Sequence, residues 1–167
     1  MASIDQLKSL ISSKGGVARS NLFRVFLPNG GSDMNILCRE VSLPSRQTLS
    51  RERVYGLQRR KVAYGFAQED VSMTFMLLNN YGAKEYFEDW KQKVVNQNTF
   101  EINYHKDYVE SVTIQQLDKN EKPVYECTLL EAYPTTMNTI QLNNEQDGLV
   151  EINVQLSYTN WTSNFFK

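Results

Sequence analysis

The sequence predicts a mainly β domain of the α+β class, an antiparallel β-barrel or β-sandwich with one flanking α-helix and a short amino-terminal helix. Its 167 residues suit one hydrophobic core, so residues 1–167 are expected to form a single domain. Hydrophobic residues make up 41% and charged residues 22%, a composition typical of folded chains. Several segments alternate apolar and polar residues, which is the period of strands with one buried face.

The first element is a short amphipathic helix. Residues 4–11 place Ile4, Leu7 and Leu10 at helical spacing, and Gly15-Gly16 is expected to end the helix. A helix this short is marginally stable alone. We therefore expect it to dock on its own domain or on a neighbouring one.

The next two elements are predicted to be strands. Residues 21–27 are rich in apolar and β-branched side chains, and residues 28–31 supply a turn. Residues 34–41 resume with mixed alternation before Leu43-Pro44. These two segments are expected to pair as a hairpin.

Residues 46–61 are strongly basic, with a net charge of +5 and one acidic residue, Glu52. We interpret this segment as a projecting hairpin or extended loop, because its charge density does not suit a core. Its basic residues are Arg46, Arg51, Arg53, Arg59, Arg60 and Lys61.

Three roles are open for this basic arm: a nucleic-acid patch, a solvated surface, or a contact with another protein. The pI of about 5.9 and the lack of a nucleic-acid-binding motif disfavour the first. Residues 1–100 carry 14 basic and 9 acidic residues, whereas residues 101–167 carry 4 and 10. This asymmetry favours contact between the arm and the acidic carboxyl-terminal third of a neighbouring copy.

The centre of the chain predicts a core strand followed by the main helix. Residues 69–78 alternate cleanly, and residues 81–96 place apolar side chains at helical spacing. The last strand, residues 150–159, alternates in the same way. The core residues expected from these elements are Phe75, Phe87, Trp90, Val154 and Leu156.

The remaining carboxyl-terminal residues predict a hairpin and a long connection. Residues 108–117 and 124–130 are expected to pair as strands, and residues 132–147 are expected to form an irregular connection. Trp161, Phe165 and Phe166 follow the last alternating strand, where they would cover a neighbour or cap their own core.

The sequence offers little support for catalysis. His105 is the single histidine, so a competing hypothesis of a small β hydrolase depends on this one residue. Nucleophile-elbow, phosphate-loop and dinucleotide-binding glycine motifs are absent. Cys38 and Cys127 are too few for a disulfide scaffold or a paired-cysteine zinc site, and both are expected to be reduced and buried. We expect no enzymatic activity, no cofactor and no metal.

The sequence also lacks the signals of membrane insertion or secretion. No stretch approaches the roughly 20 apolar residues of a membrane span, and the first residues do not resemble a signal peptide. We therefore expect no membrane anchor and production in a cytoplasm.

Several short motifs follow one another in a specific order: Asn21–Val25, Cys38–Pro44, Arg59–Val62, Val71–Phe75, Phe87–Trp90 and Tyr133–Thr135. Together with the long last strand, they resemble the tail tube proteins of contractile-tailed (T-even-type) bacteriophages and related contractile injection systems. The resemblance covers roughly residues 20–160.

This resemblance implies a structural virion protein of the tail, assembled in the host cytoplasm. Six copies would close into a ring, and stacked rings would form the inner conduit for DNA inside a contractile sheath. The implied partners are further copies of the chain, the sheath protein, the tape measure protein, and baseplate and tail terminator proteins. Two alternatives are a tube initiator at the baseplate and the tube protein of a non-phage injection system.

The polar face of the last strand is the candidate conduit surface. If its apolar residues pack on the core, the intervening residues face either the lumen of such a ring or bulk water. These residues are Glu151, Asn153, Gln155 and Ser157. DNA should pass without specific binding, which agrees with the absence of basic residues from Leu142 to Phe166.

Overall fold

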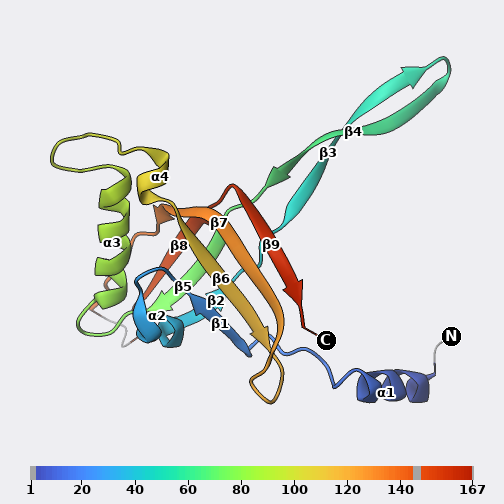
Figure 1. Cartoon of the computed structure of the whole chain (residues 1–167), viewed down its shortest axis with the longest axis horizontal. Coiled ribbons are helices and arrows are strands. Elements are labelled where there is room, and N and C mark those ends of the chain that lie inside the picture. Colours follow the sequence, from blue (N-terminus) through green and yellow to red (C-terminus); the bar gives the residue numbers. More distant parts are fainter. Residues whose placement is uncertain (1–2, 145–147, 167) are drawn as a thin grey trace.

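The computed structural model describes residues 3–144 and 148–166, and it has a β-rich body from which a long hairpin and a helix project (Figure 1). The helices are α1 (Ile4–Ser13), α2 (Gly31–Leu37), α3 (Gly82–Val94) and α4 (His105–Tyr108). The strands are β1 (Phe23–Phe26), β2 (Cys38–Val41), β3 (Arg46–Tyr55), β4 (Gln58–Gln68), β5 (Val71–Met76), β6 (Glu110–Leu117), β7 (Pro123–Met137), β8 (Glu151–Ser157) and β9 (Asn160–Phe165).

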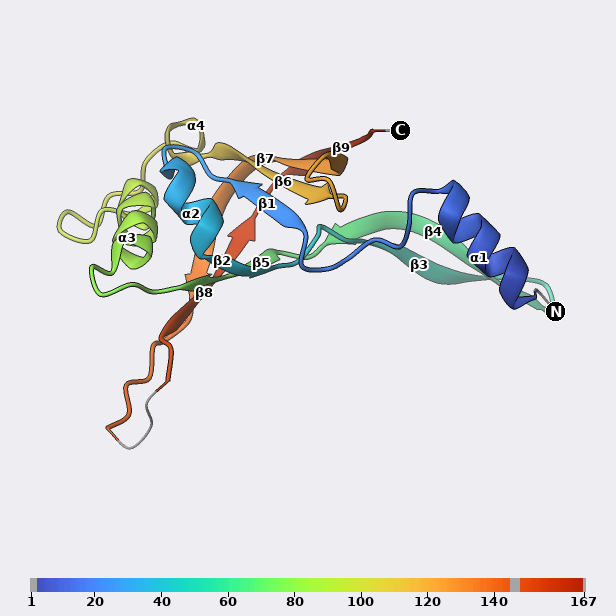
Figure 2. The same ribbon diagram turned by 90° about the horizontal axis from the view of Figure 1, so that it is seen from below.

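The body is one antiparallel sheet that folds over on itself. Its strands follow the order β1-β6-β7-β8-β5-β2, with β9 also paired to β7. Figure 2 shows β1, β6, β7 and β9 in one layer and β2 and β5 in the other. Among the described residues this path stays open and ends at β1 and β2. The mainly β prediction is confirmed, and the observed form is an open sandwich rather than a closed barrel.

Strand β7 joins the two layers. Residues 125–130 pair with both β6 and β9, whereas residues 133–137 pair with β8. Between these segments Glu131 has a φ of +54°, a left-handed conformation that is unusual for a residue with a side chain. The strand therefore changes direction at Glu131 and belongs to both layers. The expectation of an irregular connection from residue 132 was wrong up to Met137.

The predicted hairpin between residues 21–27 and 34–41 does not form. Strand β1 pairs with β6 and β2 pairs with β5, while residues 31–37 form α2. Met34 and Leu37 are buried at helical spacing, and the Asn35 side-chain oxygen accepts a hydrogen bond from the Val25 amide at 2.9 Å. This contact joins α2 to β1. Strand β2 follows α2 and pairs with β5 instead of with β1.

The core lies between the two layers and under α3. Val154 and Leu156 of β8 are fully buried, as is Phe75 of β5. Helix α3 buries Phe87 and Trp90, and the rings of Phe75 and Phe87 lie 5.1 Å apart. The predicted helix over 81–96 is therefore confirmed with slightly shorter bounds.

Trp161 and Phe165 belong to β9, a strand that the sequence pattern did not predict, and Phe166 follows it. Trp161 and Phe165 stand opposite Leu129 and Tyr125 of β7. Trp161 packs against the core, whereas the Phe165 side chain is 71% exposed. The segment therefore caps its own domain at one end and leaves an apolar side chain uncovered at the other.

Helix α1 projects from the body (Figure 2). Its amino terminus has a capping box, in which Ser3 and Gln6 exchange hydrogen bonds between side chain and backbone. None of its residues is buried, and the Ile4 side chain is 72% exposed. The helix is confirmed, and it does not dock on its own domain. Its apolar face is free for a neighbouring molecule.

Candidate subunit interface and conduit surface

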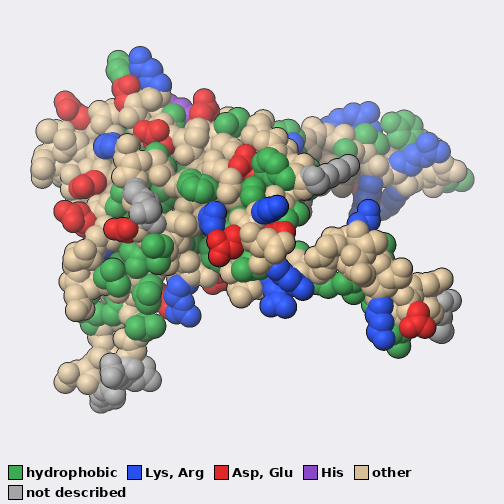
Figure 3. All heavy atoms as spheres, turned by 60° about the horizontal axis from the view of Figure 1, so that its bottom comes forward, with side chains coloured by type: hydrophobic (Ala, Val, Ile, Leu, Met, Phe, Trp, Pro, Cys, Tyr) green, Lys and Arg blue, Asp and Glu red, His purple; other side chains and the backbone are tan. Residues whose placement is uncertain are grey.

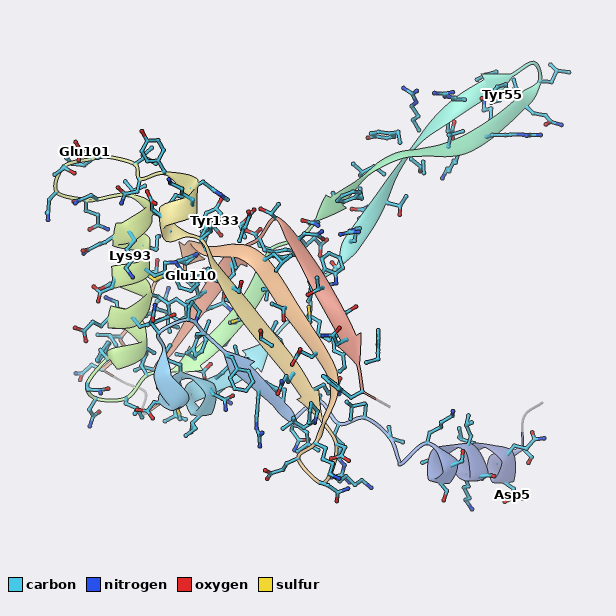
Figure 4. The ribbon with its side chains drawn as sticks, viewed as in Figure 1. Asp5, Tyr55, Lys93, Glu101, Glu110 and Tyr133 are labelled. Atoms are coloured by element: carbon cyan, nitrogen blue, oxygen red, sulfur yellow. The ribbon has the colours of Figure 1, made fainter. Side chains whose placement is uncertain are left out.

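The basic segment lies in the projecting hairpin formed by β3 and β4, here called the arm (residues 46–68). The two strands pair from Arg46 opposite Gln68 to Tyr55 opposite Gln58. Nearly all arm side chains are exposed, and Tyr55 lies near the outer end (Figure 4). Figure 3 shows Lys and Arg side chains gathered on the arm, in the distant upper right of the view. The arm adds no side chain to the buried core.

The pairing register groups the charges on the arm. Residues directly opposite one another in a hairpin share a face, and successive pairs alternate between faces. Arg53 stands opposite Arg60, and Arg51 lies two residues away on the same face. The other face pairs Glu52 with Lys61. Three arginines therefore share one face, and two of them are opposed like charges that destabilise the isolated hairpin.

Arg46 contacts residues of β9, outside the arm, whereas Arg60 donates a hydrogen bond to Gln58 within the arm. Its guanidinium carbon lies 4.4 Å from the ring centroids of both Phe66 and Trp161. Its Nη2 also donates a hydrogen bond to the Asn160 side-chain oxygen at 3.0 Å. These cation–π contacts and this hydrogen bond connect the base of the arm to β9. Arg46 therefore orients the arm rather than presenting a free charge.

The arm also carries exposed apolar side chains, which its charge pattern did not indicate. They are Val54, Tyr55, Leu57, Tyr64 and Phe66. Apolar residues beside the tight turn at Gly56 were the available signal, because such turns usually carry polar residues. The arm surface therefore combines cations with apolar area, as protein interfaces do.

The polar residues predicted on the last strand lie together on the outer face of β8. Asn153 Nδ2 donates hydrogen bonds to Ser72 Oγ at 2.8 Å and to Thr74 Oγ1 at 3.0 Å. Gln155 is exposed, and Thr135 Oγ1 donates to its backbone oxygen at 3.1 Å. Glu151 and Ser157, at the ends of the strand, are partly exposed. The face is an ordered polar surface shared by β5, β7 and β8.

The charged groups on this face are few. Glu151 forms an ion pair with Arg39 of β2, and Glu40 lies beside Thr74 of β5. Arg39 is the one lysine or arginine in β2, β5, β8 and residues 133–137, all of which the structure describes. The sequence pattern of the last strand did not indicate Arg39, because it comes from a distant strand.

The two cysteines are buried and unpaired, which confirms their expected state. Burial raises the pKa of the Cys38 thiol to about 12, with a smaller opposing effect from its hydrogen bond to the Glu40 backbone. Burial also raises the pKa of Cys127. Both thiols therefore stay protonated and poorly reactive at neutral pH.

His105 lies in an aromatic group. Its ring centroid is 5.4 Å from that of Tyr108 and 6.1 Å from that of Tyr133, both in edge-to-face arrangement. Among the described residues, no group of three His, Cys, Asp or Glu side chains could hold a metal ion. Within residues 3–144 and 148–166, no helix is long and apolar enough to cross a membrane.

The fold is similar to solved components of contractile injection systems. One is a chain of the PVC sheath-tube complex in the extended state, with a TM-score of 0.71 and 13% identity over 99% of this chain and 100% of that chain. Another is a chain of the anti-feeding prophage baseplate, with a TM-score of 0.69 and 18% identity over 89% and 96% of the two chains. At these identities the likeness is one of fold.

Sequence comparison identifies the family. No curated protein sequence matches the chain. The family model described as phage tail tube protein matches residues 10–164, which include the arm and every strand of the sheet apart from the last residue of β9. The resemblance carried by the short motifs is confirmed: the chain belongs to the phage tail tube protein family.

Proposed function

We propose that this chain is the repeating subunit of a tail tube, in which six copies close into a ring and the rings stack into a conduit for DNA. The observation that carries the proposal is the arm, a long hairpin that leaves the body and contributes nothing to its own core. Such a structure gains its stabilising contacts on another molecule. The acidic carboxyl-terminal third of a neighbouring copy supplies the complementary charge.

The open sheet supports the same assembly. Strands β1 and β2 end the sheet path and border a groove of about 710 Å³ lined in part by Phe23, Val41 and Ile114. Unpaired strand edges promote association with other chains unless they are covered. In a ring, neighbouring copies cover them, and the outer face of β8 lines the lumen. The role is structural and not enzymatic.

The family and the solved neighbours support a proposal for the wider assembly. The neighbours come from a sheath-tube complex, from a six-fold symmetrised baseplate and from a tube-terminating cap. We propose the corresponding partners for this chain: a sheath outside the tube, and a baseplate and a terminator at its ends. A tape measure protein within the tube is proposed from the family resemblance alone. Its place is the virion tail after assembly in the host cytoplasm.

A tube initiator at the baseplate is the second candidate, because one similar solved chain belongs to a baseplate. An initiator forms a single ring that other proteins extend. A tube subunit polymerises by itself into stacked rings. The tube of a non-phage injection system would also polymerise, and it would carry a cargo other than a phage genome.

Charge reversal of the arm tests the proposal. Replacing Arg51, Arg53, Arg59 and Arg60 by Glu should leave the body folded, since these side chains are exposed, and should abolish rings and tubes in negative-stain micrographs. The matched control replaces Lys93, Lys106, Lys119 and Lys122 by Glu, the same change of charge at exposed sites on the body. Tubes from the arm variant, or none from the unmodified protein, would refute the proposal.

A further inference from the structure

Of the ion pairs between described residues, the one between Arg39 and Glu151 lies on the β8 face, where Glu40 is a further charged group beside Thr74. Glu151 lies opposite Met76 of β5, and Cys38 on the far side of β5 lies opposite Phe75. The pairing of β2 is irregular between Cys38 and Glu40, which places Arg39 in a bulge. The two side chains therefore meet above the central strand of this layer.

The exposure of the pair indicates that it contributes little to the stability of the fold. The Arg39 side chain is 53% exposed and the Glu151 side chain is 34% exposed. Ion pairs with this much solvent contact contribute little to stability. The pair does, however, decide which charge the face presents, because Arg39 is the single cation of the strands that form it.

We propose that Glu151 masks Arg39 and thereby keeps this face from binding a passing polyanion. The channel setting of the inference rests on the proposed function. In a ring of six copies, freeing Arg39 would expose six guanidinium groups around the lumen. Duplex DNA carries one negative charge per roughly 1.7 Å of its axis, so such a ring would bind phosphates at every position of the duplex.

The specificity of the mask can be tested with a matched pair of variants. Glu151→Gln removes the partner of Arg39, whereas Glu40→Gln removes one negative charge from the same face without touching the ion pair. A general loss of negative charge affects both variants equally. If Glu151 masks Arg39, DNA binding increases in Glu151→Gln alone. Adding Arg39→Gln to that variant then removes the increase.

The experiment assembles tubes in the presence of a short fluorescent DNA duplex, pellets them, and measures the retained duplex as a function of salt. Only Glu151→Gln tubes should retain duplex above the unmodified level. Each engaged Arg39 should add about 0.9 to the slope of log affinity against log salt, which is about a 3.5-fold loss between 50 and 200 mM. No gain for Glu151→Gln, or an equal gain for Glu40→Gln, overturns the inference.

Two further measurements separate this inference from the proposed function. A circular plasmid has no end to thread into a channel, so equal retention of plasmid and duplex by Glu151→Gln tubes would place the face outside the tube while leaving the mask intact. The charge-reversed arm variant, which is expected not to assemble, allows the same comparison without a channel. If adding Glu151→Gln to it does not increase duplex binding above Glu40→Gln, the mask is refuted.

Discussion

Replacing Trp90 by alanine removes one of the two large side chains that α3 buries in the core, the other being Phe87. Trp90 is 4% exposed, and its ring lies 6.0 Å from Tyr86 and 6.4 Å from Phe87. Its indole nitrogen donates a hydrogen bond of 2.8 Å to the Tyr108 carbonyl, just before β6. Truncating a large buried aromatic residue costs about 3–5 kcal/mol, a large share of the roughly 5–15 kcal/mol by which domains are stable.

Trp90→Phe separates the two contributions. This variant keeps an aromatic ring in the core but removes the donor to the half-buried Tyr108 carbonyl, a loss of about 0.5–1.5 kcal/mol. Phe100→Ala is the control, because Phe100 is 83% exposed and its truncation should change stability by less than about 0.5 kcal/mol. The expected order of stability is therefore control, Trp90→Phe, Trp90→Ala.

Urea denaturation in the charge-reversed arm background is the suitable assay, because assembly would otherwise add to the apparent stability. In thermal melts the alanine variant should lose roughly 6–20 °C, given about 2–4 °C per kcal/mol for a chain of this size. An alanine variant within about 1 kcal/mol of its parent would show that α3 does not depend on Trp90.

Three other perturbations test separate parts of the structure. Arg46→Ala should lower the free energy of unfolding by about 1–2 kcal/mol in urea denaturation, because it removes two ring contacts of about 0.5–1 kcal/mol each. The control Arg51→Ala should be nearly neutral, and equal effects of the two variants would contradict a stabilising contact between Arg46 and β9. The cysteine of Gln155→Cys should react with a bulky thiol reagent in free subunits and not within tubes. The raised pKa values of Cys38 and Cys127 keep the labelling of these two thiols low at pH 8. Equal labelling of free subunits and tubes would place the β8 face on the outside of the tube. Glu131→Gly should be as stable as the parent or slightly more so in urea denaturation. Glu131→Val should be less stable by about 1–3 kcal/mol, because a β-branched side chain disfavours the left-handed backbone conformation. The reverse order of stability would argue against a left-handed conformation at Glu131.

The elements that the sequence predicted well are those whose pattern arises from burial on one side. Val71, Met73 and Phe75 alternate because β5 has one buried face, and β8 alternates for the same reason. Phe87 and Trp90 recur at helical spacing because α3 packs one face on the sheet. In these segments local pattern and tertiary burial coincide.

The errors occurred where tertiary contacts determine the structure. Pro134 indicated a connection, yet it fits β7 because this half of the strand lies at the edge of its layer and pairs with β8 alone. The exposed strand β9 has little alternation to detect. The partners of β1 and β2 are distant in sequence, so the assumption that neighbouring strands pair gave the wrong hairpin.

The candidate site was predictable in composition and not in geometry. The charge of residues 46–61 indicated an exposed arm. Charge alone could not show that Arg46 stacks on Trp161, because these residues meet only when β9 folds beside the base of the arm. The partner of Glu151 was hidden for the same reason, since Arg39 reaches it from another strand.

The pairing of Arg53 with Arg60 also affects the solubility of the unassembled subunit. The arm is a two-stranded ribbon with two free edges, and such edges can add further strands into cross-β fibres. The positive charges of the opposed arginines make the arms of two free subunits repel each other, which disfavours pairing between their strand edges. Salt shortens the range of that repulsion to about 10 Å at 0.1 M. Concentrated salt therefore removes the arm's protection against fibre formation.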